Sequence, residues 1–332
     1  NDDEGDGRRF YTDGHKIHEY LKELNENSFG KYEDIITIGE MSSTSIENCI
    51  KYSNEKEKEL SMTFNFHHLK VDYKDGDKWS DMDFDFMKLK ELFNSWQTEM
   101  DNGGGWNALF WCNHDQPRIV SRFGNDKEFH RESATMLATA IHMMKGTPYI
   151  YQGEEIGMTN AYFESIDKYR DVESLNYYDI LTKEKPQNEV LGVLQKKSRD
   201  NSRTPMQWDS SKNAGFSTGT PWLGVCKKYK DINAEKALED KNSVFYHYKN
   251  LVALRKEYEI IQNGSFEIVD MANESLYVYR RKYKNQELLV ICNFYGKEIT
   301  CDIDLEGYTL LNSNYSLTDK NIRPYEARVY IR

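Results

Sequence analysis

The chain has 332 residues, of which 38% are hydrophobic and 30% charged, a composition typical of a protein that folds in water. Its net charge of −11 argues against a general nucleic-acid binder, and no apolar run approaches the roughly 18 residues that a membrane span requires. The five cysteines are scattered without a CxxC pair, which predicts reduced thiols, a cytoplasmic location and no zinc site.

Helices and short apolar strands alternate through the first part of the chain. Helical spacing predicts helices over residues 15–25, 42–52, 84–100 and 131–144. Short apolar runs predict strands over residues 34–39, 61–66, 108–112 and 147–151. This alternation with short connections indicates βα units around a parallel sheet. Four such strands fit either a doubly wound sheet or half of an eight-stranded barrel.

The rest of the chain changes character twice. Residues 158–235 are polar and irregular, and such a length predicts a functional or inserted segment rather than an ordinary loop. A helix is predicted over residues 243–258, after which period-two patterns indicate a small antiparallel β-sandwich. We therefore predict two domains, residues 1–261 and residues 262–332.

Polar side chains follow each of the four predicted strands, namely Glu40, His67, Asp115 and Glu154. The stretch Asn107–Arg118 is the clearest case, because apolar and aromatic residues give way abruptly to Asn, His and Asp. Parallel-sheet enzymes place their chemistry at the carboxyl ends of the strands, so this coincidence predicts an active site. An alternative for Asp115 is that it caps the next helix, since Asp is a common cap.

Four motifs resemble a known family. TIGEMSS at Thr37–Ser43 and CNHDQPR at Cys112–Arg118 are similar to two signature regions of the α-amylase clan of glycoside hydrolases. SRDNSRTPMQWD at Ser198–Asp209 and YIYQGEEIGM at Tyr149–Met158 narrow the resemblance to the α-glucosidase branch. That branch includes oligo-1,6-glucosidases and trehalose-6-phosphate hydrolases.

Three further motifs most resemble the trehalose-6-phosphate hydrolase family: Gly5–His15, Met62–Tyr73 and Lys168–Tyr178. The resemblance implies an α/β fold, the C-terminal half of a (β/α)8 barrel with strands five to eight, followed by the β-sandwich. It also implies a retaining hydrolase that splits trehalose 6-phosphate into glucose and glucose 6-phosphate. We expect no cofactor, and the sequence leaves Ca²⁺ binding undecided, because the family's Ca²⁺ loop, where present, belongs to the first half of the barrel.

The resemblance implies four roles. Glu40 is implied as the general acid/base and Asp115 as the carboxylate that stabilises the transition state. His114 is implied to hydrogen-bond sugar hydroxyls, and one of Arg199 and Arg203 to contact the non-reducing glucose, with Arg199 preferred. Ion pairs of these arginines with Asp200 or Asp209 are the alternative. Because Glu40 must be protonated near neutral pH, we expect burial or neighbouring carboxylates to raise its pKa.

One element of the family is missing. Its nucleophile is an Asp in a motif like GFRLDVI, and no such motif occurs in this sequence. We therefore expect the chain to be the C-terminal portion of a longer enzyme, inactive by itself. Open strand edges would then lead either to self-association or to a partner that supplies strands one to four. A non-catalytic carbohydrate-binding relative is a further alternative.

A basic group is predicted to select the substrate. Where oligo-1,6-glucosidases carry acidic residues after the sixth strand, this sequence has His67, His68 and Lys70, and Arg8 lies in another loop at the same end. A phosphorylated sugar attracts cations and fixed donors. We expect these four residues to hold the 6-phosphate, against the alternatives of a solvated surface and a neutral-sugar α-glucosidase.

Overall fold

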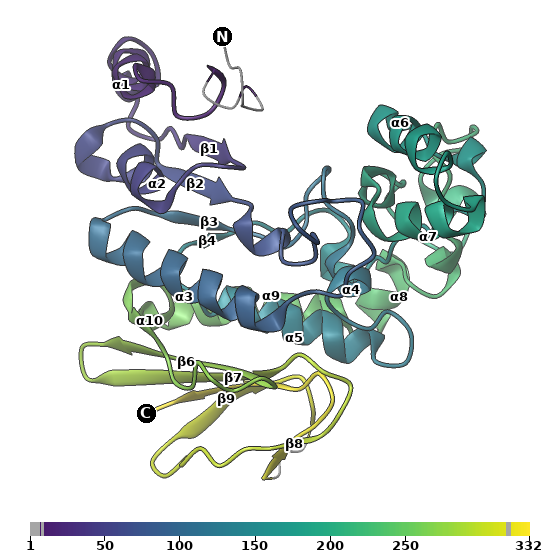
Figure 1. Ribbon diagram of the computed structural model, residues 1–332. Helices are drawn as coiled ribbons and strands as arrows, with labels where there is room; N and C mark the ends of the chain where they lie inside the picture. The colour runs from purple at the N-terminus through teal and green to yellow at the C-terminus, as the bar shows by residue number, and fades with distance from the viewer. Residues whose placement is uncertain (1–6, 8–9, 317–319) are drawn as a thin grey trace.

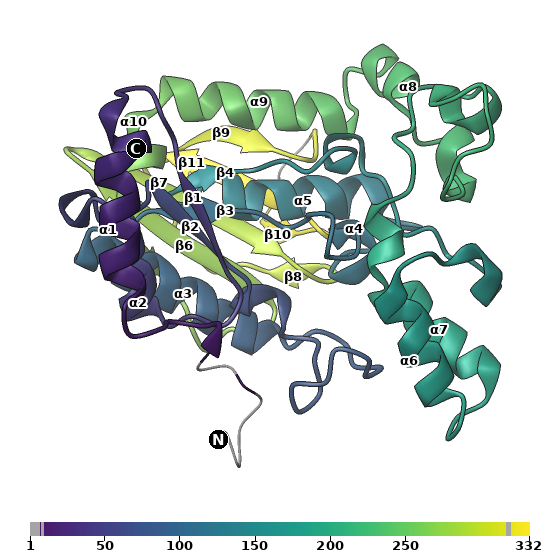
Figure 2. The same ribbon diagram turned by 90° about the horizontal axis from the view of Figure 1, so that it is seen from above.

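A computed structural model describes residue 7, residues 10–316 and residues 320–332. It has a four-stranded parallel sheet, a layer of helices beneath it, and an antiparallel sheet below the helices (Figure 1). Helices α6 and α7 lie together to one side of this stack, and α8 lies on the same side next to the start of α9 (Figures 1 and 2).

The element bounds are as follows. The α-helices are α1 Ile17–Asn27, α2 Ile46–Ser53, α3 Phe86–Gly103, α4 Ile119–Arg122, α5 His130–His142, α6 Val172–Leu181, α7 Gln187–Lys197, α8 Ala234–Glu239, α9 Val244–Glu257 and α10 Glu259–Asn263. The strands are β1 Ile38–Met41, β2 Met62–Asn65, β3 Asn107–Leu109, β4 Thr147–Pro148, β5 Ser265–Ile268, β6 Leu276–Tyr283, β7 Gln286–Asn293, β8 Ile299–Thr300, β9 Thr309–Ser313, β10 Asn321–Ile322 and β11 Ala327–Ile331. Three short 3-10 helices carry residues that were predicted for the site, namely η4 His67–Leu69, η5 Glu154–Ile156 and η7 Arg199–Ser202.

The parallel sheet has the order β1-β2-β3-β4, so β1 and β4 are its edges. Glu40 lies in register with Phe64 of β2, and Phe64 in register with Ala108 of β3. The strands are shorter than predicted. Ile36 is 68% exposed and lies outside β1, because no neighbouring strand among the described residues pairs with or covers that segment.

Local signals explain where the main helices begin and end. The side chain of Asp85 accepts a hydrogen bond from the backbone N–H of Lys88 and caps α3, which ends before Gly104 at a φ of 73°. Ser45 caps α2 in the same way through the N–H of Asn48. The predicted helices over these stretches are confirmed to within a few residues at each end.

The antiparallel part contains a five-stranded sheet of order β5-β6-β7-β11-β9 and a two-stranded sheet of β8 and β10. Apolar side chains of β6 and β7, including Val278 and Ile291, pack against Ile322 of β10 and form a small core of their own. The other face packs on α3, α5 and α10, where Tyr279 and Leu288 join the same core as Trp111. The predicted sandwich and fold class are therefore confirmed.

Buried arginines connect the helix layer to the segments next to it. Arg281 of β6 donates hydrogen bonds to the carbonyl oxygens of Met143, Ile261 and Gly264. Arg255 of α9 does the same for carbonyl groups just after α5, including that of Met144. These arginines satisfy carbonyl groups that a helix end leaves without partners. The predicted domain boundary at residue 261 falls within α10 and stays a prediction.

Candidate active site

Asp115 lies in the loop that follows β3. Its backbone N–H donates to Oδ1 of Asn113 at 2.8 Å, which turns the chain and leaves the Asp115 side chain 31% exposed. Asp115 does not cap the next helix. The residue at the start of α4 is Arg118, and no side chain caps that helix. The capping alternative for Asp115 is therefore wrong.

Two arginines from the inserted segment contact Asp115. Nη2 of Arg203 lies 2.6 Å from Oδ1 of Asp115, and Nη1 of Arg199 lies 3.4 Å from the same oxygen. Nε2 of His114 lies 3.6 Å from Oδ2. Burial by itself would raise the pKa of Asp115, but the hydrogen bond from Arg203 and the charges of His114, Arg199 and Arg203 together lower it. Asp115 is thus an ionised carboxylate.

Both arginines also contact Asp171, a residue that the sequence did not single out. Nη2 of Arg199 and Nη1 of Arg203 lie 3.0 Å and 3.2 Å from its Oδ1. The expected partners Asp200 and Asp209 are not the ones found. Asp200 instead accepts backbone N–H groups of Arg170 and Asp171. Asp171 could have been noticed as the N-cap of α6, because its side chain accepts from the N–H of Ser174.

Glu40 lies in the last half of β1 with an exposed side chain. It lines a groove of about 870 Å³ between β1, the first turns of α1 and the preceding segment that includes Tyr11. The burial that was expected to favour its protonated form is not supplied by the described residues of this chain.

The predicted phosphate residues that the structure describes, His67, His68 and Lys70, have different surroundings. Nε2 of His68 lies 2.9 Å from the carbonyl oxygen of Phe110, and burial lowers the pKa of His68 to about 4. A buried, neutral imidazole offers no cation to a ligand, so we leave His68 out of the proposed phosphate site. The His67 ring packs 5.1 Å from the ring of Trp96.

Lys70 joins two of the loops that carry site residues. Its Nζ donates to the carbonyl oxygen of Ser42 at 2.5 Å, so it bridges the loop after β2 to the loop after β1. Arg8 lies outside the described residues.

A buried ion triad lies beneath these loops. Asp72 accepts from Nε of Arg122 at 2.8 Å and pairs with Nζ of Lys197 at 2.7 Å. All three side chains are 3–4% exposed. Arg122 also donates to Oε1 of Gln116, the residue after Asp115, and Lys197 precedes the segment that carries Arg199. The triad therefore fixes three loops relative to one another.

Glu154 is a buried acid next to the loop of Asp115. Its Oε1 accepts from the hydroxyl of Tyr248 at 2.8 Å. Burial raises the pKa of Glu154 from 4.5 to about 7, and the hydrogen bond from Tyr248 only partly opposes this rise. Glu154 in the folded chain therefore keeps its proton well above the pH at which an exposed Glu loses it.

This proton makes stability depend on pH. From pH 4.5 to about 7 the unfolded chain releases the Glu154 proton while the folded chain retains it. The stability due to the protonated carboxyl is therefore full below pH 4.5 and lost as pH rises to about 7. Relative to Glu154→Gln, the unaltered chain should lose about 3 kcal/mol across this window in urea unfolding. Exposed Glu189→Gln is the control, and equal pH slopes for the chain and Glu154→Gln would contradict the prediction.

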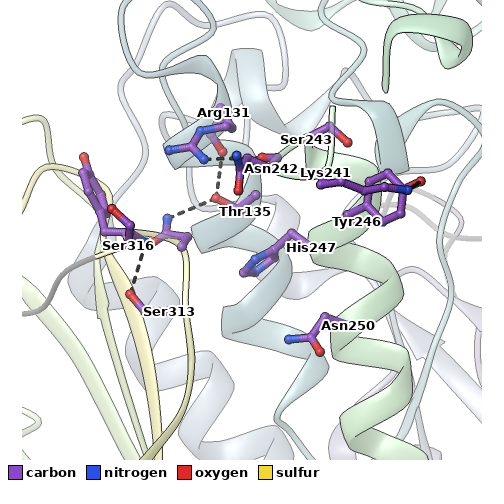
Figure 3. A pocket seen from close by; sticks show the side chains of 12 residues that line it. Arg131, Thr135, Lys241, Asn242, Ser243, Tyr246, His247, Asn250, Ser313 and Ser316 are labelled. Atoms are coloured by element: carbon purple, nitrogen blue, oxygen red, sulfur yellow. Dashed lines mark hydrogen bonds between the residues drawn. The ribbon is translucent and has the colours of Figure 1, made fainter. Parts of the chain in front are cut away.

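A separate polar pocket of about 470 Å³ lies between α5, α9 and the end of β9 (Figure 3). Arg131 and Thr135 face it from α5, and His247 and Asn250 face it from α9. It holds none of the predicted site residues.

Within the described part of the chain, no three His, Cys, Asp or Glu residues are grouped to hold a metal ion, and no helix is long and apolar enough to cross a bilayer.

Glu40 and Asp115 lie at the carboxyl ends of parallel strands, and two arginines of a long insertion lie beside Asp115; enzymes of the α/β-barrel class place their active sites at this end of the sheet. A family model described as alpha amylase, catalytic domain, matches residues 1–264. The chain therefore belongs to the alpha-amylase family.

Individual relatives agree with this assignment. Trehalose-6-phosphate hydrolase of Bacillus subtilis is 54% identical over 99% of this chain and 61% of its own length. Oligo-1,6-glucosidase of Halalkalibacterium halodurans is 46% identical over 98% of this chain and 60% of its own. The crystal structure of Bacillus licheniformis trehalose-6-phosphate hydrolase superposes with a TM-score of 0.94 at 57% identity, over 99% of this chain and 61% of that one. The chain thus spans about three fifths of the length of these relatives.

Proposed function

We propose that this chain supplies part of the active site of a retaining glycoside hydrolase that splits trehalose 6-phosphate into glucose and glucose 6-phosphate. The observation that carries the proposal is the Asp115 carboxylate, held ionised by Arg203 and Arg199 at the carboxyl end of β3. A fixed anion beside the reacting carbon stabilises an oxocarbenium-like transition state.

Five of the predicted site residues act on the sugar in this proposal. Glu40 protonates the oxygen of the leaving sugar, Asp115 stabilises the transition state, and His114, Arg199 and Arg203 donate to sugar hydroxyls. Retention requires a second carboxyl group about 5–5.5 Å from the acid, on the other side of the bond. We propose that this nucleophile belongs to the part of the relatives that this chain does not match, so the chain alone does not turn over substrate.

The second candidate is an oligo-1,6-glucosidase, because such enzymes are 46% identical to the chain. We favour the phosphorylated substrate because of Lys70, whose ammonium group lies between the loops after β1 and β2. An ammonium group attracts a phosphate as a point charge, and a neutral isomaltose unit has no group that needs it. The predicted cytoplasmic location rests on cysteine usage and stays a prediction.

A fusion tests the proposed function. The part of the Bacillus subtilis hydrolase that precedes the matched stretch is joined ahead of Asn1, which completes the barrel. We expect this barrel-completing fusion to hydrolyse trehalose 6-phosphate in preference to isomaltose, and we expect neither substrate to be turned over by the 332-residue chain. Preference for isomaltose would favour the second candidate, and turnover by the chain alone would overturn the assignment of the nucleophile.

Lys70→Gln in the same fusion tests the phosphate contact. Removing the ammonium group should raise KM for trehalose 6-phosphate by about 10-fold or more, because a charge-assisted contact is worth about 1.5–3 kcal/mol. KM for a neutral glucoside such as p-nitrophenyl glucoside should change little. Lys74→Gln, which alters an exposed lysine further along the same loop, is the control. Equal losses on both substrates would mean that Lys70 only positions the loop.

We also propose that the β1 side of the chain is covered in the working enzyme. β1 is an edge strand, and exposed apolar residues gather beside it, among them Phe10, Tyr11, Ile35 and Ile36. Such a surface is covered by a partner that continues the sheet or by a second copy of the chain. Size-exclusion chromatography should therefore show the chain as an oligomer and the barrel-completing fusion as a monomer.

A further inference from the structure

Asp115 and Asp171 share the same two guanidinium groups. Arg203 pairs with Asp115 at 2.6 Å and with Asp171 at 3.2 Å. Arg199 pairs with Asp171 at 3.0 Å and with Asp115 at 3.4 Å. The four side chains thus form a closed arrangement in which each carboxylate touches both arginines and each arginine touches both carboxylates.

The two carboxylates differ in how firmly they are held. The Asp171 side chain is 3% exposed, whereas that of Asp115 is 31% exposed and faces the site. Asp171 accepts from the N–H of Ser174 at the start of α6, and its own backbone N–H donates to the buried carboxylate of Asp200. Asp171 is therefore the fixed end of the arrangement, and Asp115 is the end that a ligand can reach.

Other groups contact Arg199 and Arg203, and they differ between the two arginines. Oε2 of Glu173 lies 3.1 Å from Nε of Arg199 and 2.6 Å from Nζ of Lys78. His114 lies beside Asp115, and its carbonyl oxygen accepts from Nε of Arg203 at 2.8 Å. Asp171 is the carboxylate that anchors both arginines from the protein side, since Glu173 pairs with Arg199 and Asp200 is bonded to backbone N–H groups.

We propose that Asp171 is a positioning residue that anchors Arg199 and Arg203 from the protein side. Both guanidinium groups then stay in the site, and neither of them pairs with Asp115 alone. The inference deepens the proposed function, because Asp115 and the two arginines are the groups assigned there to the sugar. Donors that are already held in place need not rearrange when charge develops on the substrate in the transition state. Without Asp171, Asp115 would be the carboxylate left to Arg203 among the described residues, and Arg199 would keep Asp115 and Glu173.

The test is a carboxyl-carbon NMR titration of the 332-residue chain labelled at Asp. Asp171→Asn removes the charge but retains a cap for α6, because Asn and Asp cap equally well. The Asp115 resonance, identified by its loss in Asp115→Asn, should titrate at a lower pH in Asp171→Asn than in the unaltered chain. Asp179→Asn removes the same charge from an exposed position on the same helix and should leave the Asp115 titration unchanged.

The outcomes separate positioning from a purely structural role. An unchanged or higher titration midpoint of Asp115 in Asp171→Asn would overturn the proposal, as would an equal shift in Asp179→Asn. Asp171→Ser, a second neutral cap, decides the question if Asp171→Asn does not fold. The measurement needs neither substrate nor turnover. A shift without hydrolysis by the barrel-completing fusion would therefore support the positioning role and refute only the proposed function.

Discussion

Replacing Asp115 by Asn in the barrel-completing fusion is expected to lower kcat for trehalose 6-phosphate by about 10²–10³-fold. The substitution keeps the size of the side chain and an oxygen that can accept from Arg203, but it removes the negative charge. That charge is what favours an oxocarbenium-like transition state over the neutral substrate. KM should change much less than kcat, because the bound ground state carries no developing positive charge.

Steady-state kinetics at a fixed pH would measure this loss, with Asp179→Asn as a charge-matched control far along α6. The Asp115→Asn fusion should also unfold at nearly the same temperature as the parent, since its side chain is partly exposed. A fall of less than about 10-fold in kcat would remove Asp115 from the catalytic groups, since that is well below the cost of losing one such interaction.

The largest expected effect on stability is that of Asp72→Asn. This change leaves Arg122 and Lys197 as two buried cations without a carboxylate, and breaking a buried ion pair in this way costs about 3–5 kcal/mol. Both cations also lie over the ring of Tyr73, which is too weak an interaction to replace the lost anion. Urea unfolding of the chain and the variant would give the difference in free energy.

The chain offers a matched control for this prediction. Asp81 pairs with Lys196, the neighbour of Lys197, at 2.5 Å, but both of these side chains are more than half exposed. A surface pair of this kind contributes about 0–1 kcal/mol, so Asp81→Asn should have little effect. If Asp72→Asn cost no more than Asp81→Asn, the triad would not be what fixes the three loops.

Much of the fold could be predicted because periodicity and caps are local signals. The stretch that begins near Asp85 combines an Asp cap, a regular apolar stripe and a terminal glycine, and it forms α3 as expected. The position of Asp115 after an apolar run also predicted correctly that it would lie in a loop beyond a strand. Strand ends were harder, because the length of a strand is set by its neighbours. Trp111 is fully buried, yet it lies beyond β3.

The contacts within the site could not be predicted because they depend on tertiary partners. The sequence His67–Lys70 looks like a basic cluster, but His68 turns into the core and its ring forms a hydrogen bond with the carbonyl oxygen of Phe110. The partner of Arg199 and Arg203 is Asp171, which lies 28 and 32 residues before them. A sequence gives the ionisable groups near a motif, whereas the choice among candidate partners follows from how the inserted segment folds back on the barrel.

The contacts of the buried Arg281 determine whether this chain can be cut into separately folding parts. Arg281 belongs to the antiparallel sheet, but the carbonyl groups that it satisfies belong to the end of α5 and to α10. Cutting the chain at residue 261 would therefore remove the donor to the carbonyl group of Met143 and expose the apolar face that packs on Tyr279 and Leu288, although Arg255 would keep its contacts just after α5. The predicted boundary falls inside α10, in a packed layer, and not at a hinge between modules. A recombination or deletion that moves the catalytic part must carry the antiparallel sheet with it.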